Sequence, residues 1–158
     1  MATLRFKGLY FLGVAVLIRL LLILPPLQAR LIEPVIGDLR YGGLLYIFSL
    51  LMVLLTLLSN VHLSGFKVLA AGMASNFLVI AANFGQMPGP LEKLTAAGYS
   101  GPIPGYWSNF KVINENTPLW FLGDNFLIGH PWPLPSVLSF GDLLIIVGAF
   151  WFFQRVMK

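Results

Sequence analysis

Four stretches of apolar residues dominate the chain, separated by polar residues, prolines and glycines. A helix rises about 1.5 Å per residue and the hydrocarbon core of a bilayer is about 30 Å thick, so each stretch approaches the length of a membrane-spanning helix. The pattern therefore predicts four transmembrane helices. They are expected at about residues 6–24, 41–59, 67–84 and 138–153.

The composition agrees with a membrane protein. Of the 158 residues, 58% are hydrophobic and 10% are charged, and the mean hydropathy is +0.83. Soluble domains have about a quarter of their residues charged. We therefore expect an all-α integral membrane protein that forms a single membrane domain over residues 1–158. The chain has no cysteine, which excludes disulfides, thiol catalysis and thiolate metal sites.

Residues 85–137, between the third and fourth stretches, form the unusual part of the layout. They hold eight of the eleven prolines and three of the four tryptophans, Trp107, Trp120 and Trp132. Tryptophans favour the headgroup level, and prolines prevent another spanning helix, so we expect a cap on the outer membrane surface. Short helices are predicted at residues 90–97 and 117–123. A partly ordered surface loop is the alternative.

The charges predict an orientation. The net charge of +4 is scattered around the ends of the apolar stretches, which argues against a nucleic-acid partner. On the side of the termini lie Arg5, Lys7, Lys67, Arg155 and Lys158. By the positive-inside rule both termini are expected to be cytoplasmic. The first stretch resembles a cleaved signal peptide in its basic start, but Arg19 interrupts it and no small-residue cleavage site follows.

Polar residues inside the apolar stretches are the most specific feature. Asn76 and Asn83 lie seven positions apart, on one face of the third predicted helix. Helix rise places Asn83 roughly 24 Å above Lys67, at a depth similar to that of Asp142. Arg19 lies lower on the first helix, and its long side chain reaches upwards. We predict an intramembrane polar cluster of Arg19, Asn76, Asn83 and Asp142.

This cluster has two interpretations. In the first, asparagines form hydrogen bonds across helices, Arg19 snorkels, and the cluster gives packing specificity of about 1 kcal/mol or less per bond. In the second, the cluster is a catalytic or ligand site beneath the cap. The first is favoured, because small residues such as Ala70, Ala74 and Ser75 beside the asparagines indicate close helix packing.

Other enzymatic chemistry has little support in the sequence. His62 and His130 stand apart, with no second histidine at ligand spacing, so no metal site or cofactor is predicted. A pair of carboxylates remains. Asp124 and Asp142 are both expected on the outer side, where they are able to share a proton as an acid/base dyad.

Several motifs carry a family resemblance. They are NFLVIAANFGQMP (76 to 88), LEKLTAAG (91 to 98), TPLWFLGD (117 to 124) and LSFGDLLIIVG (138 to 148). On these motifs the chain resembles a bacterial family of small multi-pass membrane proteins known only as a domain of unknown function. The resemblance covers nearly the whole chain and implies a location in the bacterial inner membrane. It implies no activity.

A second resemblance implies chemistry. The run PSVLSFGDLLIIVG is similar to the last helix of lipoprotein signal peptidases, which are four-helix aspartyl proteases, and Asp142 matches one catalytic aspartate. The other aspartate of that family follows a glycine–asparagine pair by three residues. Here Ser75 precedes Asn76, and Val79 stands at the acidic position. Asp124 would have to replace it from a different segment.

We therefore predict a non-catalytic subunit or scaffold of a larger membrane complex. Its expected partners are the lipid bilayer and other membrane subunits or a second copy of the chain. The alternatives are a membrane-embedded aspartate-dependent hydrolase and a small transporter. Four helices without an internal repeat are few for alternating access, which makes the transporter the weakest alternative.

Overall fold

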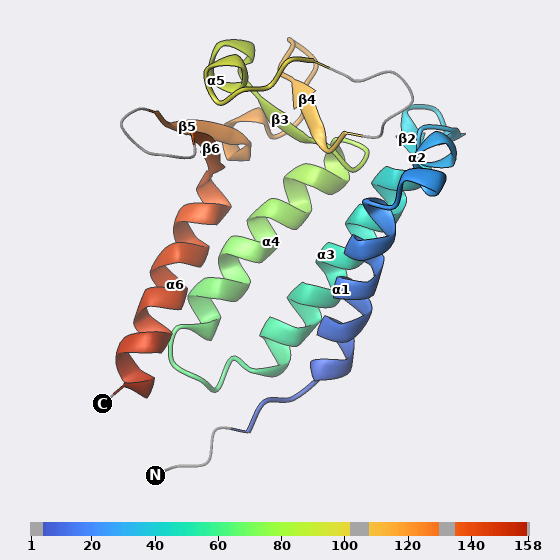
Figure 1. The fold of residues 1–158 in the computed structure, drawn as a ribbon. Helices are drawn as coiled ribbons and strands as arrows, with labels where there is room; N and C mark the ends of the chain where they lie inside the picture. The colour runs from blue at the N-terminus through green and yellow to red at the C-terminus, as the bar shows by residue number, and fades with distance from the viewer. Residues whose placement is uncertain (1–4, 102–107, 130–134, 158) are drawn as a thin grey trace.

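Four long helices stand side by side in one row, and a mixed cap covers one end of it (Figure 1). The computed structural model describes residues 5–101, 108–129 and 135–157. The long helices are α1 (Leu9–Leu22), α3 (Tyr41–Ser59), α4 (Phe66–Ala82) and α6 (Phe140–Val156). Helix α4 packs against α6 on one side and α3 on the other, and α3 packs against α1. Both termini lie at the end of the row opposite the cap.

Short elements connect and cover the long helices. Beside α1 and α3 lie helix α2 (Pro25–Leu31) and an antiparallel pair of strands, β1 (Pro34–Ile36) and β2 (Leu39–Arg40). The cap contains β3 (Met87–Gly89), α5 (Leu91–Ala96), β4 (Phe110–Val112), the 3-10 helix η1 (Trp120–Leu122), β5 (Asp124–Ile128) and β6 (Ser136–Ser139). Strands β3 and β4 pair in parallel, whereas β5 and β6 form an antiparallel hairpin.

The prediction of an all-α protein with four transmembrane helices is wrong. Within the described ranges the chain forms three two-stranded sheets, and α3 is the one helix that is long and apolar enough to cross a membrane. Helices α1 and α2 pass that test only as a pair, and they are bent by 90° at the break between them. Helix α4 is apolar but has 17 residues.

The observed ends of the helices explain why the four-helix membrane prediction is wrong. Some residues of the apolar stretches form strands, caps and turns instead of helix. Pro25 and Pro26 start a new helix and leave α1 with 14 residues, a rise of about 21 Å. Leu138 and Ser139 belong to β6 rather than to α6. The sequence did locate a long helix in each apolar stretch, and the bounds predicted for α3 agree with the structure.

The predicted short helix of the cap is confirmed. Helix α5 spans Leu91–Ala96, with Pro90 as its N-cap and Gly98 in the left-handed region at φ 92°. The second short helix is reduced to the three residues of η1. Trp120 lies in η1 with 53% of its surface exposed, while Trp107 and Trp132 lie outside the described residues.

Glycines bring α4 and α6 into backbone contact. A Cβ added to Gly72 of α4 would lie 2.5 Å from the carbonyl oxygen of Gly141, and one added to Gly148 of α6 would lie 2.7 Å from the Leu69 nitrogen. Gly65, which precedes α4, faces Gly148 in the same way. The glycines are seven residues apart on each segment, two helical turns, so both pairs lie along one contact line.

Candidate functional site

Polar side chains meet where α4, α6 and the β5–β6 hairpin join. Asn76 of α4 donates from Nδ2 to Oδ1 of Asp142 over 2.8 Å, and Ser139 donates from Oγ to Oδ1 of Asn76 over 2.8 Å. Ser139 is fully buried and Asn76 is 6% exposed. These three residues, together with Asp124, are called the polar junction below. It connects the row of helices to the cap.

Ser139 and Asp142 also form the N-terminal cap of α6. The Ser139 hydroxyl accepts from the backbone nitrogen of Asp142 over 3.0 Å, and Oδ2 of Asp142 accepts from the backbone nitrogen of Ser139 over 2.9 Å. This reciprocal arrangement is a capping box, which satisfies backbone donors that the helix leaves unpaired. Ser139 is at the same time the last residue of β6, so no loop separates the hairpin from the helix.

The backbone of α6 shapes the junction as much as its side chains do. Gly141 lies directly against Asn76, and an added Cβ there would overlap Oδ1 of Asn76. The nearby contact of Gly72 with Gly141 draws the two helices together. Because both positions lack a side chain, Asn76 is able to reach Ser139 and Asp142 directly rather than through water.

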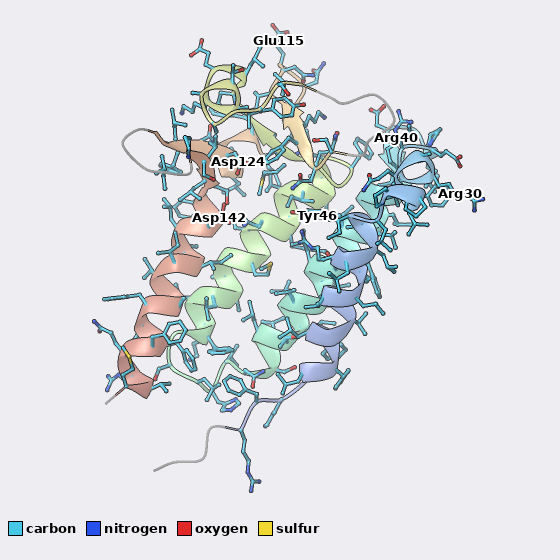
Figure 2. All side chains as sticks on the ribbon, in the orientation of Figure 1. Arg30, Arg40, Tyr46, Glu115, Asp124 and Asp142 are labelled. Carbon is cyan, nitrogen blue, oxygen red and sulfur yellow. The ribbon has the colours of Figure 1, made fainter. Side chains whose placement is uncertain are left out.

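Asp124 completes the junction from the cap. It begins β5 and pairs in register with Ser139 of β6, and 4% of its surface is exposed. Figure 2 shows Asp124 just above Asp142, where the cap meets α6. Burial raises the pKa of Asp124 from 3.8 to about 7, and the nearby charge of Asp142 adds to the increase. Within the described ranges its carboxyl group forms no hydrogen bond.

The two carboxyl groups therefore have different chemical surroundings. Both oxygens of Asp142 accept hydrogen bonds, one from Asn76 and one from the Ser139 backbone. Asp124 is instead buried beside another acid, which raises its pKa, so it binds a proton up to about neutral pH. An acid whose pKa is raised to about neutrality is able to hold or pass a proton. The same bonds that occupy Asp142 also hold two helices and a hairpin together.

The remaining residues of the predicted cluster lie elsewhere. Arg19 donates from Nε to Oγ of Ser49 over 2.9 Å, and its guanidinium carbon lies 3.9 Å from the ring centre of Tyr46. It thus belongs to the contact between α1 and α3. Asn83 is the C-cap of α4 and donates to the carbonyl oxygens of Val79 and Pro118 over 2.8 and 2.9 Å.

The offset of Asn83 has a geometric cause. The predicted depths require the third and fourth predicted helices to begin at matched levels. Helix α4 ends at Ala82, and α6 begins only after β6 has entered from the cap. Asp142 therefore lies level with Asn76, two turns below Asn83, and Asn83 contacts the cap instead.

Ser139 and Ser49 form polar contacts that the sequence analysis does not predict. Ser139 had a usable signal, because a serine three residues before an acid at the start of an apolar run is a capping-box pattern. Ser49 had none. It lies within a continuous apolar helix, and its hydroxyl also donates to the carbonyl oxygen of Tyr46 in its own helix. The glycine spacing of seven was visible in the sequence but was not used.

Fold and junction together define a class of small protein in which a row of apolar helices carries a mixed cap, with polar side chains placed where the helices touch. The chain belongs to a family of unknown function (DUF5317), which matches residues 3–154. An uncharacterized protein of Thermotoga maritima is 26% identical over 153 residues, which cover 94% of this chain and 75% of that protein. No solved structure matches the chain. The expected membership in a family of unknown function is thereby confirmed.

Proposed function

We propose that this protein is a non-catalytic membrane subunit that is anchored through α3 and holds a partner protein through α6. The distribution of polar and apolar side chains supports this proposal. Polar side chains are buried between the helices, while large apolar side chains cover their outer flanks. Soluble domains have the opposite arrangement, whereas proteins in lipid place polar groups at helix contacts.

The outer helices α1 and α6 provide the apolar flanks. Tyr10 and Leu17 of α1 are 69% and 58% exposed, and Phe150 and Phe153 of α6 are 63% and 58% exposed. Contiguous apolar surface of this kind marks a contact with lipid or with another protein. Helix α3 lies inside the row and is the helix that is long enough to cross. One crossing, through α3, is sufficient for the proposed anchoring.

Buried polar side chains support the same interpretation. Ser49, Thr56, Asn76 and Ser139 are each at most 7% exposed. Each forms a hydrogen bond, with the backbone of its own helix or with a neighbouring segment. Asp142 has both oxygens occupied by bonds that hold the fold together, which favours a structural role for this acid over a catalytic one.

The face of α6 is the proposed partner surface. Phe150, Trp151 and Phe153 form an aromatic flank there, and aromatic residues are enriched at protein interfaces. The flank lies toward the end of the molecule that carries both termini (Figure 1). Arg5, Lys7 and Arg155 belong to that end, so we place it on the cytoplasmic side of a bacterial inner membrane.

Membrane location is tested by fractionation. Expressed in a bacterial host, the protein should sediment with the membranes and remain there through an alkaline carbonate wash. Release by carbonate would overturn the anchoring role of α3. The partner surface is tested by a photoreactive residue at Phe150, with a matched one at Leu12 of α1. Protein adducts of defined mass should form at Phe150, and adducts with lipid alone at both positions would overturn a subunit role for α6.

A second function, an aspartate-dependent hydrolase related to lipoprotein signal peptidases, has one specific observation in its favour. Asp124 lies against the polar junction with a pKa raised to about 7 by burial and by Asp142. An acid of this kind is suited to proton transfer at neutral pH. Asp124→Asn and Asp142→Asn separate the two functions. A hydrolase loses activity toward a membrane peptide substrate in both variants while folding is retained, whereas a subunit keeps its partners in Asp124→Asn.

A further inference from the structure

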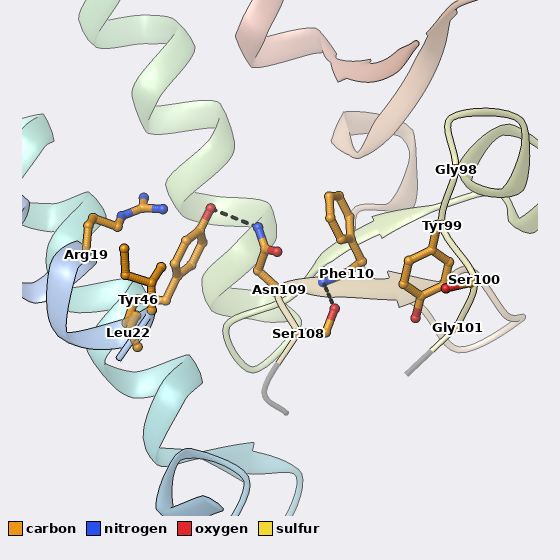
Figure 3. A pocket seen from close by; sticks show the side chains of 11 residues that line it. Arg19, Leu22, Tyr46, Gly98, Tyr99, Ser100, Gly101, Ser108, Asn109 and Phe110 are labelled. Atoms are coloured by element: carbon orange, nitrogen blue, oxygen red, sulfur yellow. Dashed lines mark hydrogen bonds between the residues drawn. The ribbon is translucent and has the colours of Figure 1, made fainter. Parts of the chain in front are cut away.

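A cavity of about 410 Å³ lies between the upper ends of α1 and α3 and two segments of the cap (Figure 3). Its volume is within the range of roughly 300–1,000 Å³ that is usual for small-molecule sites. Arg19, Leu22 and Ile23 line it from the α1 side, with Tyr46 from α3. The cap contributes residues 98–101 and 108–110. We refer to it as the Arg19 pocket.

Arg19 is the charge of this pocket, and the fold holds it in one place. Its Nε bonds Ser49, and its guanidinium carbon lies 3.9 Å from the ring centre of Tyr46. The two terminal amino groups form no hydrogen bond with any residue that the structure describes. A half-buried guanidinium requires acceptors for these donors, and oxyanions match its planar fork.

No described residue of the lining is acidic, so the pocket carries one positive charge without an internal counter-charge. Two serine hydroxyls also line the cavity. The Ser108 hydroxyl accepts from the Phe110 nitrogen over 3.2 Å and retains its own O–H proton, and the Ser100 side chain also faces the cavity. Together with the terminal amino groups of Arg19, these hydroxyls suit an oxyanion with several acceptor oxygens, such as a phosphate group.

The walls of the pocket are fixed before any ligand arrives. Gln86 donates from Nε2 to the carbonyl oxygens of Ser108 and Phe110 over 3.0 and 3.1 Å. Asn109 donates from Nδ2 to the Tyr46 hydroxyl over 3.3 Å, which ties the cap to α3 beside Arg19 (Figure 3). A site that is ordered in advance loses less conformational entropy on binding.

Apolar surface continues out of the pocket along α1. Leu22 and Ile23 line the cavity, and at the same end of α1 Leu20, Ile23 and Leu24 are 53%, 63% and 43% exposed. A ligand with a negatively charged head and an alkyl chain would contact both Arg19 and the apolar end of α1. A phosphodiester carries one negative charge, which equals the charge of the pocket.

We propose that the Arg19 pocket binds the phosphate of a membrane phospholipid, with the guanidinium as a bidentate donor and an acyl chain along the apolar end of α1. This ligand rests on the proposed membrane location. It deepens the proposed function, because a bound lipid fills the space between the cap and the α1–α3 pair.

The test measures binding of a short-chain fluorescent phosphatidylglycerol to the purified full chain in a neutral detergent. Arg19→Met should weaken binding roughly tenfold or more, since it removes a charged hydrogen-bonding pair. Arg30→Met is the matched control, because it removes an exposed cation of α2 outside the pocket, and it should leave affinity within about twofold. Equal affinity of wild type and Arg19→Met would overturn the proposal.

Two further arms keep the result interpretable. Ser100 is exposed and lines the pocket, so Ser100→Trp should block binding without altering helix contacts, even if Arg19→Met fails to fold. Unchanged binding in Ser100→Trp overturns the site. Competition by millimolar inorganic phosphate would assign the site to free phosphate, and stronger competition by decanoate would assign it to a fatty acid. Either outcome overturns the phospholipid. Retention in carbonate-washed membranes separates a failure here from a failure of the anchoring role.

Discussion

The two outer helix pairs of the row, α4–α6 and α1–α3, are joined in different ways. In α4–α6 the backbones touch at Gly65, Gly72, Gly141 and Gly148, and polar side chains bond directly across the contact. In α1–α3 side chains fill the contact. Ile18 and Leu22 pack with Leu31, Leu45 and Tyr46, and Arg19 reaches Ser49.

This difference shows what glycine contributes to helix packing. Close backbones leave no space between the helices, so the polar groups of α4 and α6 satisfy one another without an intervening molecule. Helices kept apart by side chains leave space at their upper end, and the Arg19 pocket lies there. The tighter pair should therefore be the more sensitive to added volume, and the wider pair the more tolerant.

The largest loss of stability is expected from Gly72→Val. The new side chain would overlap the Gly141 carbonyl and press on Ile145, and neither backbone is able to move independently. We expect a loss of more than about 4 kcal/mol of unfolding free energy. Gly13→Ala is the control on α1, where an added Cβ meets nothing within 4 Å, and it should stabilise by about 0.5–1 kcal/mol. Thermal unfolding in detergent measures both, and similar effects at the two glycines would contradict the comparison.

The second largest effect is the change of the unfolding free energy with pH that Asp124 causes. Because its pKa is raised from 3.8 to about 7, the folded state keeps a proton that the unfolded state has released across this range. The stabilisation is complete below about pH 4 and is lost as the pH rises to about 7, by roughly 2 to 4 kcal/mol. Asp124→Asn should flatten this fall, and Glu115→Gln, at an exposed carboxylate, should not. Melting temperatures between pH 4 and 8 measure it, and parallel curves for Asp124→Asn and wild type would refute the assignment.

A smaller effect is expected from Ser139→Ala. The change removes the cap of α6 and the bond to Asn76 while the backbone pairing of β6 is kept. The expected cost is about 1–2 kcal/mol. Ser136→Ala lies on the exposed side of the same strand and should cost less than about 0.5 kcal/mol. Melting temperatures of the two variants at pH 5 make the comparison, and a cost at Ser136 equal to that at Ser139 would remove the junction's special role.

The smallest effect is expected from Ser49→Ala in the wider pair. It removes the hydrogen bond from Arg19 and the bond to the Tyr46 carbonyl within α3, while Arg19 keeps its stacking on Tyr46, so the cost should be about 1 kcal/mol. Ser59→Ala is matched, since Ser59 donates only within its own helix, to the Leu55 carbonyl. Thermal scans of both should differ by a few tenths of a kcal/mol. A loss at Ser49 as large as that at Ser139 would show that the two pairs depend equally on polar contacts.

Helix positions were largely predictable from the sequence, while helix ends were not. Apolar periodicity locates α3 with the correct bounds, because nothing within residues 41–59 competes with helix. At α1 and α6 local chemistry decides instead, through the prolines at 25 and 26 and through Ser139. The short strands of the cap contain three to five residues each, too few to give a periodic signal.

The candidate site was accessible only in part, for a related reason. The predicted cluster contains Asn76 and Asp142, which lie on regular helices that pack together and bond each other, but the rise per residue put Asn83 rather than Asn76 at the depth of Asp142. The same reasoning fails for Asn83, because it lies past the end of α4, and for Arg19, whose long side chain is able to reach several partners. The position of Asp124 depends on strand register, and register follows from hairpin geometry that the sequence pattern does not specify.

The direct passage from β6 into α6 at Ser139 has a mechanical consequence. Because no loop separates them, the hairpin and the helix form one rigid unit. The hydrogen bonds among Asn76, Ser139 and Asp142 attach this unit to α4. Helix α6 is about 25 Å long and also touches Gly65 and α4 at Gly148, toward its aromatic end. A displacement of that end should therefore move α4, α6 and the hairpin together, with Asp124 carried along.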